Sequence, residues 1–236
     1  MYFNSTRIAK IVGAVVFIGA GFFTFGQGLL FEKIYLALLA FIAVIFIREI
    51  NLVSIIAITA MSNLSSMLLF PLVNGSNFQM ILKILTYLAI ILSLIKFSEE
   101  SLRLSIAVVV ALCIGAEFYW YFSDHQGAVI YWYVLLININ MLVRYFFFRR
   151  VFIMAKYFPN QYRSLDLDHS LYQVVLLYIV VHELVLVEYV LRRVFDVPST
   201  VLYYAAPYLF HGLTTYTVLL ILLQGYTLIT QHWFKA

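Results

Sequence analysis

Charged residues are scarce in this chain. Asp, Glu, Lys and Arg make up 11% of its 236 residues, and hydrophobic residues make up 64%. Soluble domains carry roughly 25% charged residues and have a smaller apolar fraction. A chain of this composition cannot cover a core with polar surface, so lipid must be its solvent. The composition therefore excludes a soluble enzyme or a soluble binding domain.

Cysteine is almost absent, since Cys113 is the single example. One cysteine cannot form an internal disulfide, and it leaves no CxxC pair and no zinc-type spacing. His182 and Glu183 begin an HExx sequence, but Leu186 stands where the zinc motif requires a second His. We therefore expect no metal site and no cofactor.

Acidic residues are fewer than basic ones, and the formal net charge is +4. The basic residues stand in short loops beside apolar segments, where membrane topology and anionic lipid headgroups account for them. We therefore expect contact with a lipid bilayer and no nucleic-acid partner.

Long apolar segments fill most of the chain. A helix needs about 20 such residues to cross ~30 Å of hydrocarbon. We expect about eight spans, near residues 8–30, 33–48, 52–73, 79–97, 102–122, 127–148, 170–192 and within 199–231. The segment 33–48 is short, so seven spans are the alternative.

The predicted fold class is an all-α, polytopic helical bundle that forms one transmembrane domain over 1–236, with no soluble domain. The last apolar run is longer than a membrane is thick, so Pro207 predicts a kink or a separate interfacial turn before it. Lys and Arg are concentrated in loops on the side of the N-terminus, which predicts a cytoplasmic N-terminus and C-terminus. The compact architecture suggests a bacterial inner membrane.

The segment 169–193 is apolar enough to cross a bilayer and yet contains His182, Glu183 and Glu188. Ionisable residues inside a span are rare and mark ion or proton paths, or paired groups. At 100° per residue the three side chains point in three directions. We expect a central helix with neighbours on most sides, and Glu183 with His182 on an ion or proton path. Glu188 is spaced for an ion pair with Arg192.

A second group of polar residues is predicted to lie at one depth near the outer surface. Helix rise places Glu117, Glu188 and His211 within about 10 Å of that surface. These three residues could form an outer vestibule together with four tyrosines of the same regions, Tyr131, Tyr133, Tyr204 and Tyr208. The alternative is a set of separate residues hydrogen-bonded to different neighbours.

The order of Cys113, Arg144 and His182 on successive spans resembles exosortases and archaeosortases, which are multi-span membrane transpeptidases. Leu112-Cys113-Ile114-Gly115 is similar to the cysteine motif of that family, but Ile114 stands where the family has Ser or Thr. The resemblance covers about a third of the chain. It implies an intramembrane cysteine transpeptidase or protease in which Cys113, Arg144 and His182 are the catalytic residues.

Three functions follow from these patterns. The first is a small channel or transporter, or the membrane subunit of a larger complex, without a catalytic site. The second is the cysteine enzyme. The third is a sensor or scaffold whose loop 149–169 docks a cytoplasmic protein, because Arg149 and Arg150 are followed by Asp166 and Asp168. Polar faces on several helices also favour a homo-oligomer.

Overall fold

A computed structural model describes residues 15, 18, 19, 21–25, 28–75, 79–97, 100–123 and 130–233. Within these ranges the chain is helical apart from short turns and connections, and it contains no strand. The predicted all-α fold class is therefore confirmed. Most of the first predicted span, 8–30, lies outside the described residues, as do both chain ends, whose cytoplasmic placement stays a prediction.

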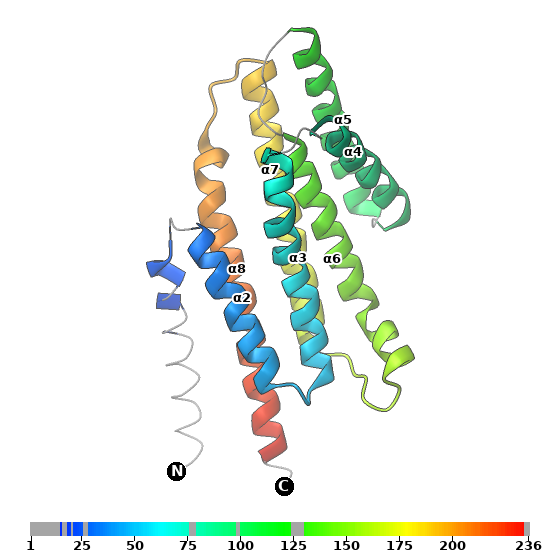
Figure 1. The fold of residues 1–236 in the computed structure, drawn as a ribbon, viewed down its shortest axis with the longest axis vertical. Helices are drawn as coiled ribbons and strands as arrows, with labels where there is room; N and C mark the ends of the chain where they lie inside the picture. The colour runs from blue at the N-terminus through cyan, green and yellow to red at the C-terminus, as the bar shows by residue number, and fades with distance from the viewer. Residues whose placement is uncertain are drawn as a thin grey trace. The chain divides into compact units, whose positions relative to one another are not determined.

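Long helices follow one another along the described chain (Figure 1). Their bounds are α2 (Gly28–Ile45), α3 (Ile50–Gly75), α4 (Gln79–Lys96), α5 (Glu100–Phe122), α6 (Ile130–Tyr157), α7 (Asp166–Val194) and α8 (Val201–Trp233). Six of these, α3 to α8, contain a stretch that is long and apolar enough to cross a membrane. The chain is a helical membrane protein.

Large apolar side chains cover the outside of these helices. Leu68, Leu104 and Val201 are examples whose side chains are more than two-thirds exposed. Soluble proteins avoid extended apolar surfaces of this kind, because they drive association in water. The exposed leucine, isoleucine and phenylalanine side chains therefore fit a hydrocarbon solvent.

The connection between α6 and α7 is shorter than the sequence suggests. The apolar run ends near residue 148, but α6 continues to Tyr157 and α7 already begins at Asp166. The predicted loop 149–169 is therefore mostly helix, and only 158–165 connects the two helices. Arg150 near the end of α6 and Asp168 in the first turn of α7 form an ion pair there, as described below.

The separate interfacial turn predicted before Pro207 is not formed, and the predicted kink stays a prediction. Pro207 lies in the second turn of α8, and the helix is continuous from Val201 to Trp233. Proline removes one backbone donor and restricts the residue before it. Because Pro207 lies near the start of α8, only one backbone hydrogen bond inside the helix is lost, and the helix continues.

The chain divides into two compact units, each made of several segments. Unit 1 contains Met1–Ala60, Phe147–Val174 and Tyr208–Ala236, and unit 2 contains Met61–Phe146 and Val175–Pro207. The helices α3, α6, α7 and α8 contribute residues to both units.

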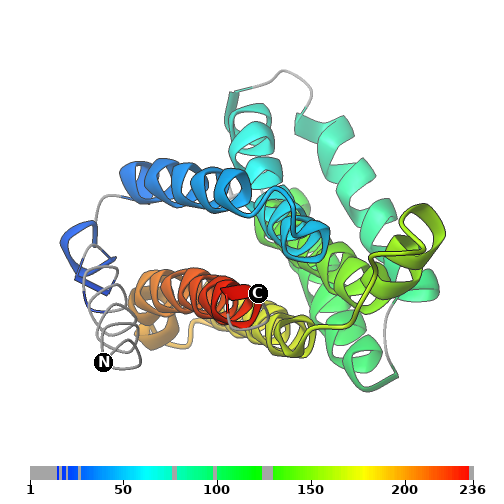
Figure 2. The same cartoon turned by 90° about the horizontal axis from the view of Figure 1, so that it is seen from below.

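In unit 1, α2 packs alongside the C-terminal part of α8 (Figure 2). The ring of Phe31 lies 3.9 Å from the His211 ring, measured between centroids. Further along, Gly225 allows α8 to approach the turn that links α2 and α3. A Cβ atom at this position would lie 2.8 Å from Cζ of Phe46, so a side chain here would displace that ring.

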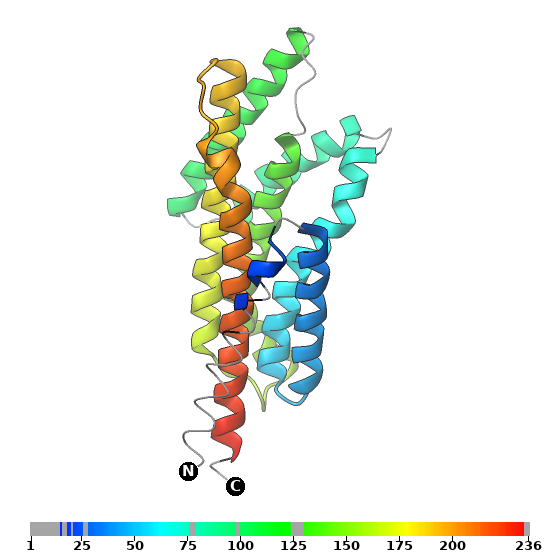
Figure 3. The same cartoon turned by 90° about the vertical axis from the view of Figure 1, so that its left-hand side faces the viewer.

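In unit 2, α4 and α5 pack against each other. α6 and α7 are the most enclosed of the six candidate spans over their lengths, with 61% and 50% of their apolar windows buried, against 22–28% for the others. Figure 3 shows the end of α7, where the chain reverses through residues 195–200 into α8. This reversal positions the candidate site.

Candidate functional site

The three ionisable residues inside α7 face three different helices. His182 lies beside Tyr133 of α6, with ring centroids 6.1 Å apart. Glu183 meets α5, and Glu188 meets the start of α8. All three are buried, with exposed fractions of 5–8%. The structure therefore agrees with the sequence argument that this helix has neighbours on most sides.

The imidazole of His182 has a fixed orientation. Its Nδ1 lies 2.6 Å from the carbonyl oxygen of Tyr178, one turn earlier on α7. A carbonyl oxygen only accepts hydrogen bonds, so Nδ1 is the donor. The bond leaves Nε2 as the ring atom that faces away from its own helix backbone.

Glu183 is held by a hydroxyl group. Ser105 Oγ of α5 donates to Glu183 Oε1 over 3.3 Å. This is a long hydrogen bond, and the second carboxyl oxygen is not part of it. Glu183 is thus a buried acidic group with weak support from its neighbours, next to His182 in the chain.

Glu188 caps the start of α8. Its Oε1 accepts Ser199 Oγ at 2.6 Å and the Leu202 N–H at 3.1 Å, and its Oε2 accepts the Tyr203 N–H at 2.6 Å. The first backbone N–H groups of a helix have no partner within the helix, and a negative charge there is also favoured by the helix dipole. The expected ion pair of Glu188 with Arg192 does not form. Its carboxylate instead accepts hydrogen bonds from backbone N–H groups of α8.

The turn between the helices brings this cap into place. α7 ends at Val194, and Asp196 then adopts a φ of 54°, in the left-handed region. Asp tolerates this conformation better than most residues because its short polar side chain interacts locally. The N–H of Val197 returns to the carbonyl of Leu191 over 3.2 Å. The reversal is thereby closed, and Ser199 lies beside Glu188.

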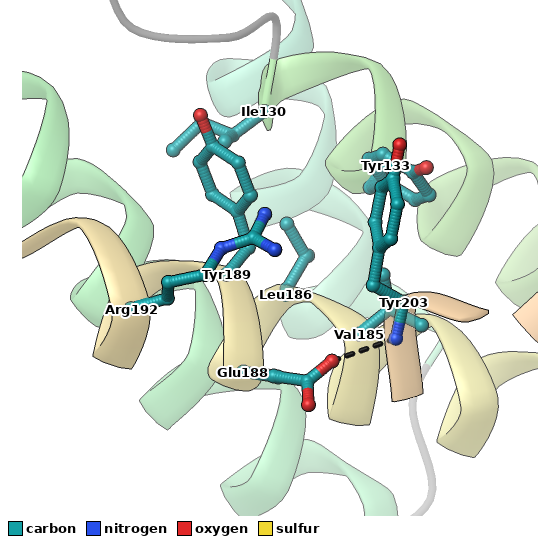
Figure 4. A pocket seen from close by; sticks show the side chains of 8 residues that line it. All are labelled: Ile130, Tyr133, Val185, Leu186, Glu188, Tyr189, Arg192 and Tyr203. Atoms are coloured by element: carbon teal, nitrogen blue, oxygen red, sulfur yellow. Dashed lines mark hydrogen bonds between the residues drawn. The ribbon is translucent and has the colours of Figure 1, made fainter. Parts of the chain in front are cut away.

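A pocket opens between α6, α7 and the first turn of α8, within unit 2 (Figure 4). It holds about 510 Å³, its open mouth included. Its lining combines tyrosine rings, aliphatic side chains and two charged groups, from Ile130, Tyr133, Val185, Leu186, Glu188, Tyr189, Arg192 and Tyr203. Ligand sites in proteins have this character, mostly apolar with a few polar groups.

Arg192 is the cation of this pocket. Its guanidinium carbon lies 5.5 Å from the centre of the Tyr189 ring and 5.2 Å from that of Tyr203. Its Nε atom is buried without a hydrogen-bond acceptor among the described residues. The guanidinium group is thus held by two aromatic faces rather than by a carboxylate.

The residues of the predicted outer vestibule fall in both units, and their contacts are described unit by unit. Glu188 and Tyr133 line the pocket, but Tyr204 does not, and its side chain is 67% exposed. Glu117 forms an ion pair with Lys83 of α4 at 2.6 Å. Lys83 also lies over the Tyr131 ring, 5.7 Å from its centre.

The remaining two vestibule residues belong to unit 1. His211 Nε2 bonds the Gly21 carbonyl, and its ring lies against Phe25 and Phe31. Tyr208 stacks on Phe25 with 4.4 Å between centroids. These contacts give both residues a structural role in holding residues 21–25 and α2 against α8.

The three residues that resemble the exosortase set lie on three consecutive helices, α5, α6 and α7. Cys113 is 0% exposed, and the ionisable residue one turn along α5 is Glu117. Reactive cysteines need a positive neighbour, and a carboxylate is the opposite. Along α6, Arg144 lies 11 residues from Tyr133, the residue that touches His182, which is about 16 Å of helix. The catalytic role that the resemblance implies for these residues stays a prediction.

A buried charge network that the sequence did not reveal lies in unit 1. Arg150 is 1% exposed and binds Asp168 through two bonds, Nε to Oδ1 and Nη2 to Oδ2, each 2.5 Å long. Its Nη1 also donates to Ser54 Oγ at 3.2 Å and to Asn51 Oδ1 at 3.3 Å, and Nη2 donates to the Arg163 carbonyl at 2.9 Å. Arg150 thereby joins α3, α6, α7 and the 158–165 connection.

The same network extends through Asn51 and Arg163. Asn51 Nδ2 donates to the Gln161 carbonyl at 2.7 Å, and its Oδ1 accepts the Arg163 N–H at 3.0 Å. Arg163 then pairs with Glu49 at 3.1 Å. Two of the four charges that suggested a docking loop, Arg150 and Asp168, are therefore engaged inside the protein.

Within the part of the chain that the structure describes, no group of three or more His, Cys, Asp or Glu side chains could hold a metal ion. Comparisons with protein-family models, with curated proteins and with solved structures give no match. Function must therefore be argued from the geometry of the site.

Proposed function

We propose that this protein is a membrane transport protein whose solute binds in the α6–α7–α8 pocket and whose cycle involves the ionisable residues of α7. The observation that carries the proposal is the position of Tyr133. This residue lines the pocket and also touches the His182 ring, at 6.1 Å between centroids. An occupant of the pocket would therefore be one side chain away from His182.

The helix α7 supports the same reading. His182 and Glu183 lie within one turn of Val185 and Leu186, which line the pocket. Buried ionisable residues in membrane spans are costly and are usual on proton and ion paths. A buried histidine and a buried carboxyl group give a transport protein two groups that can each bind and release a proton as the pocket fills and empties.

Proton flux in proteoliposomes tests the proposal. Vesicles that contain a pH-sensitive dye would be given a pH gradient and a potassium diffusion potential, with wild-type protein, Glu183→Gln or His182→Gln. Wild-type protein should carry protons faster than protein-free vesicles. Glu183→Gln should lower that flux about tenfold or more, because an amide cannot take up and release a proton as a carboxyl group does, and a positioned acid or base contributes at least this factor to proton transfer in enzymes.

The matched control is Glu49→Gln, the same change at a helix end in unit 1, where Glu49 pairs with Arg163. This variant should transport protons as the wild type does. Absence of flux under both driving forces, with correctly folded protein, would overturn the transport proposal and favour a membrane subunit of a larger assembly. Equal flux in wild type and in both α7 variants would remove His182 and Glu183 from the path.

A further inference from the structure

The charge balance of the pocket is unusual. Glu188 and Arg192 both line it and stand one turn apart on α7, yet they do not neutralise each other directly. Both oxygens of Glu188 are occupied by the Ser199 hydroxyl and by N–H groups of α8. The positive end of the α8 dipole balances this carboxylate. Of the two charged side chains that line the pocket, Arg192 is therefore the one that can bind a ligand.

The guanidinium group is prepared for an anion. Among the described residues it forms no ion pair with a carboxylate. The rings of Tyr189 and Tyr203 fix its position at 5.5 Å and 5.2 Å. A planar guanidinium group with a fixed orientation can form two parallel hydrogen bonds to a carboxylate or phosphate.

The rest of the lining suits an apolar body. Tyr133, Tyr189 and Tyr203 offer ring faces, and Ile130, Val185 and Leu186 offer aliphatic contact. In Figure 4 the Glu188 side chain points toward the Tyr203 N–H, and the Arg192 guanidinium group lies beside Tyr189.

We propose that the pocket binds an organic anion, with its carboxylate or phosphate on Arg192 and its apolar or aromatic body against the tyrosines. This inference adds a substrate class to the proposed transport function, and it is tested by binding alone. The same chemistry could come from a soluble aromatic acid or from the headgroup of an anionic lipid. The experiment separates the two sources.

The purified protein would be placed in nanodiscs of phosphatidylcholine, and naphthoate binding would be measured by equilibrium dialysis. Naphthalenemethanol, which has the same ring without the charge, is the ligand control. Naphthoate should bind more tightly than the alcohol. Arg192→Gln should weaken naphthoate binding about tenfold or more, because hydrogen bonds to charged groups are worth this much.

Arg193→Gln is the matched protein control, since Arg193 is exposed, adjacent in the chain and absent from the pocket lining. Its affinity for naphthoate should equal that of the wild type. If Arg192→Gln does not give a monodisperse protein, Arg192→Lys keeps the charge and loses the planar fork. Tyr189→Leu, which removes one ring beside the guanidinium group, should also weaken binding.

The lipid arm repeats the measurement in nanodiscs that contain phosphatidylglycerol. Competition between phosphatidylglycerol and naphthoate, lost in Arg192→Gln, would identify a lipid headgroup as an occupant. Naphthoate binding that phosphatidylglycerol leaves unchanged would identify a soluble anion. Either result supports an anion site at Arg192.

The inference is overturned if naphthoate and naphthalenemethanol bind equally, or if Arg192→Gln and Arg193→Gln have the same affinity and phosphatidylglycerol has no effect. The outcome is distinct from that of the transport assay. Binding without proton flux would refute transport and keep the anion site. Flux that depends on Glu183 without naphthoate or lipid binding would keep transport and refute the anion site.

Discussion

Glu188, near the end of α7, accepts a hydrogen bond of 2.6 Å from the backbone N–H of Tyr203, in the first turn of α8. One acidic side chain thereby fixes the start of the next helix and the position of a pocket tyrosine. The structure thus couples a helix cap to the geometry of the candidate binding site.

Glu188→Gln should lower the free energy of unfolding by about 1–2 kcal/mol, because one cap oxygen and the charge at the α8 N-terminus are lost. Thermal unfolding in detergent would measure the change. Asp166→Asn is the control, since Asp166 is exposed in the first turn of α7 and should alter stability by less. Equal losses for the two variants would contradict a capping role.

Arg150→Met should lower the free energy of unfolding by about 3–5 kcal/mol, because removal of one partner leaves Asp168, whose side chain is only 12% exposed, as an uncompensated charge. Asp168→Asn should also destabilise strongly. In the double variant Arg150→Met/Asp168→Leu the loss should be smaller than the sum of the two single losses, as expected for a directly coupled pair. Additive losses in this double-mutant cycle would show that the two residues act independently.

Gly225→Leu should destabilise the protein by about 1–3 kcal/mol, because an added side chain must displace the ring of Phe46. Gly212→Leu is the matched control on the same helix. A Cβ atom at position 212 meets nothing within 4 Å, and the position is exposed. Thermal unfolding of both variants would check the difference, and an equal shift in the two would rule out a close approach at Gly225.

Asp196→Val should destabilise the turn between α7 and α8 by about 1–2 kcal/mol, because a β-branched residue is strained at positive φ. Asp196→Gly should be close to neutral, since glycine adopts this conformation freely. Naphthoate binding provides a second readout, because the turn positions Ser199 beside Glu188 and so fixes the start of α8. Similar behaviour of the two variants would indicate that the backbone conformation at Asp196 is not constraining.

The fold class and most helix positions could be predicted from the sequence because apolar length is a direct consequence of bilayer thickness. The directions of His182, Glu183 and Glu188 could also be predicted, since helix geometry fixes the angle between neighbouring side chains. Both predictions concern properties that a single helix has on its own.

The partners of these residues could not be predicted in the same way. For Glu188 the sequence offers Arg192 at a favourable spacing, whereas the structure uses backbone N–H groups of α8. Every residue except proline has such a group, so no residue type signals it. The Lys83–Glu117 ion pair could have been predicted from the sequence. Lys83 lies about one turn from the start of α4, and Glu117 lies about one turn from the end of α5. In consecutive antiparallel helices these two ends are adjacent.

Arg150 illustrates the limit of hydropathy. The apolar run ends before this residue, which therefore resembles a loop cation, and yet its side chain is almost completely buried. Burial becomes possible because Asp168, Ser54, Asn51 and the Arg163 carbonyl satisfy the guanidinium group together. These partners come from three separate parts of the chain, and their meeting depends on tertiary packing.

The spacing of the Arg150 network has a consequence for synthesis of the protein. Asp168 follows Arg150 by 18 residues, whereas Asn51 precedes it by 99 residues. As the chain emerges from the ribosome, α3 is already complete when Arg150 appears, and Asp168 arrives soon afterwards. Arg150 can therefore gain its counter-charge only after the first turn of α7 has followed it out of the ribosome. Neutralisation of the buried Arg150 therefore depends on the synthesis of α7, although its polar partners in α3 are present earlier.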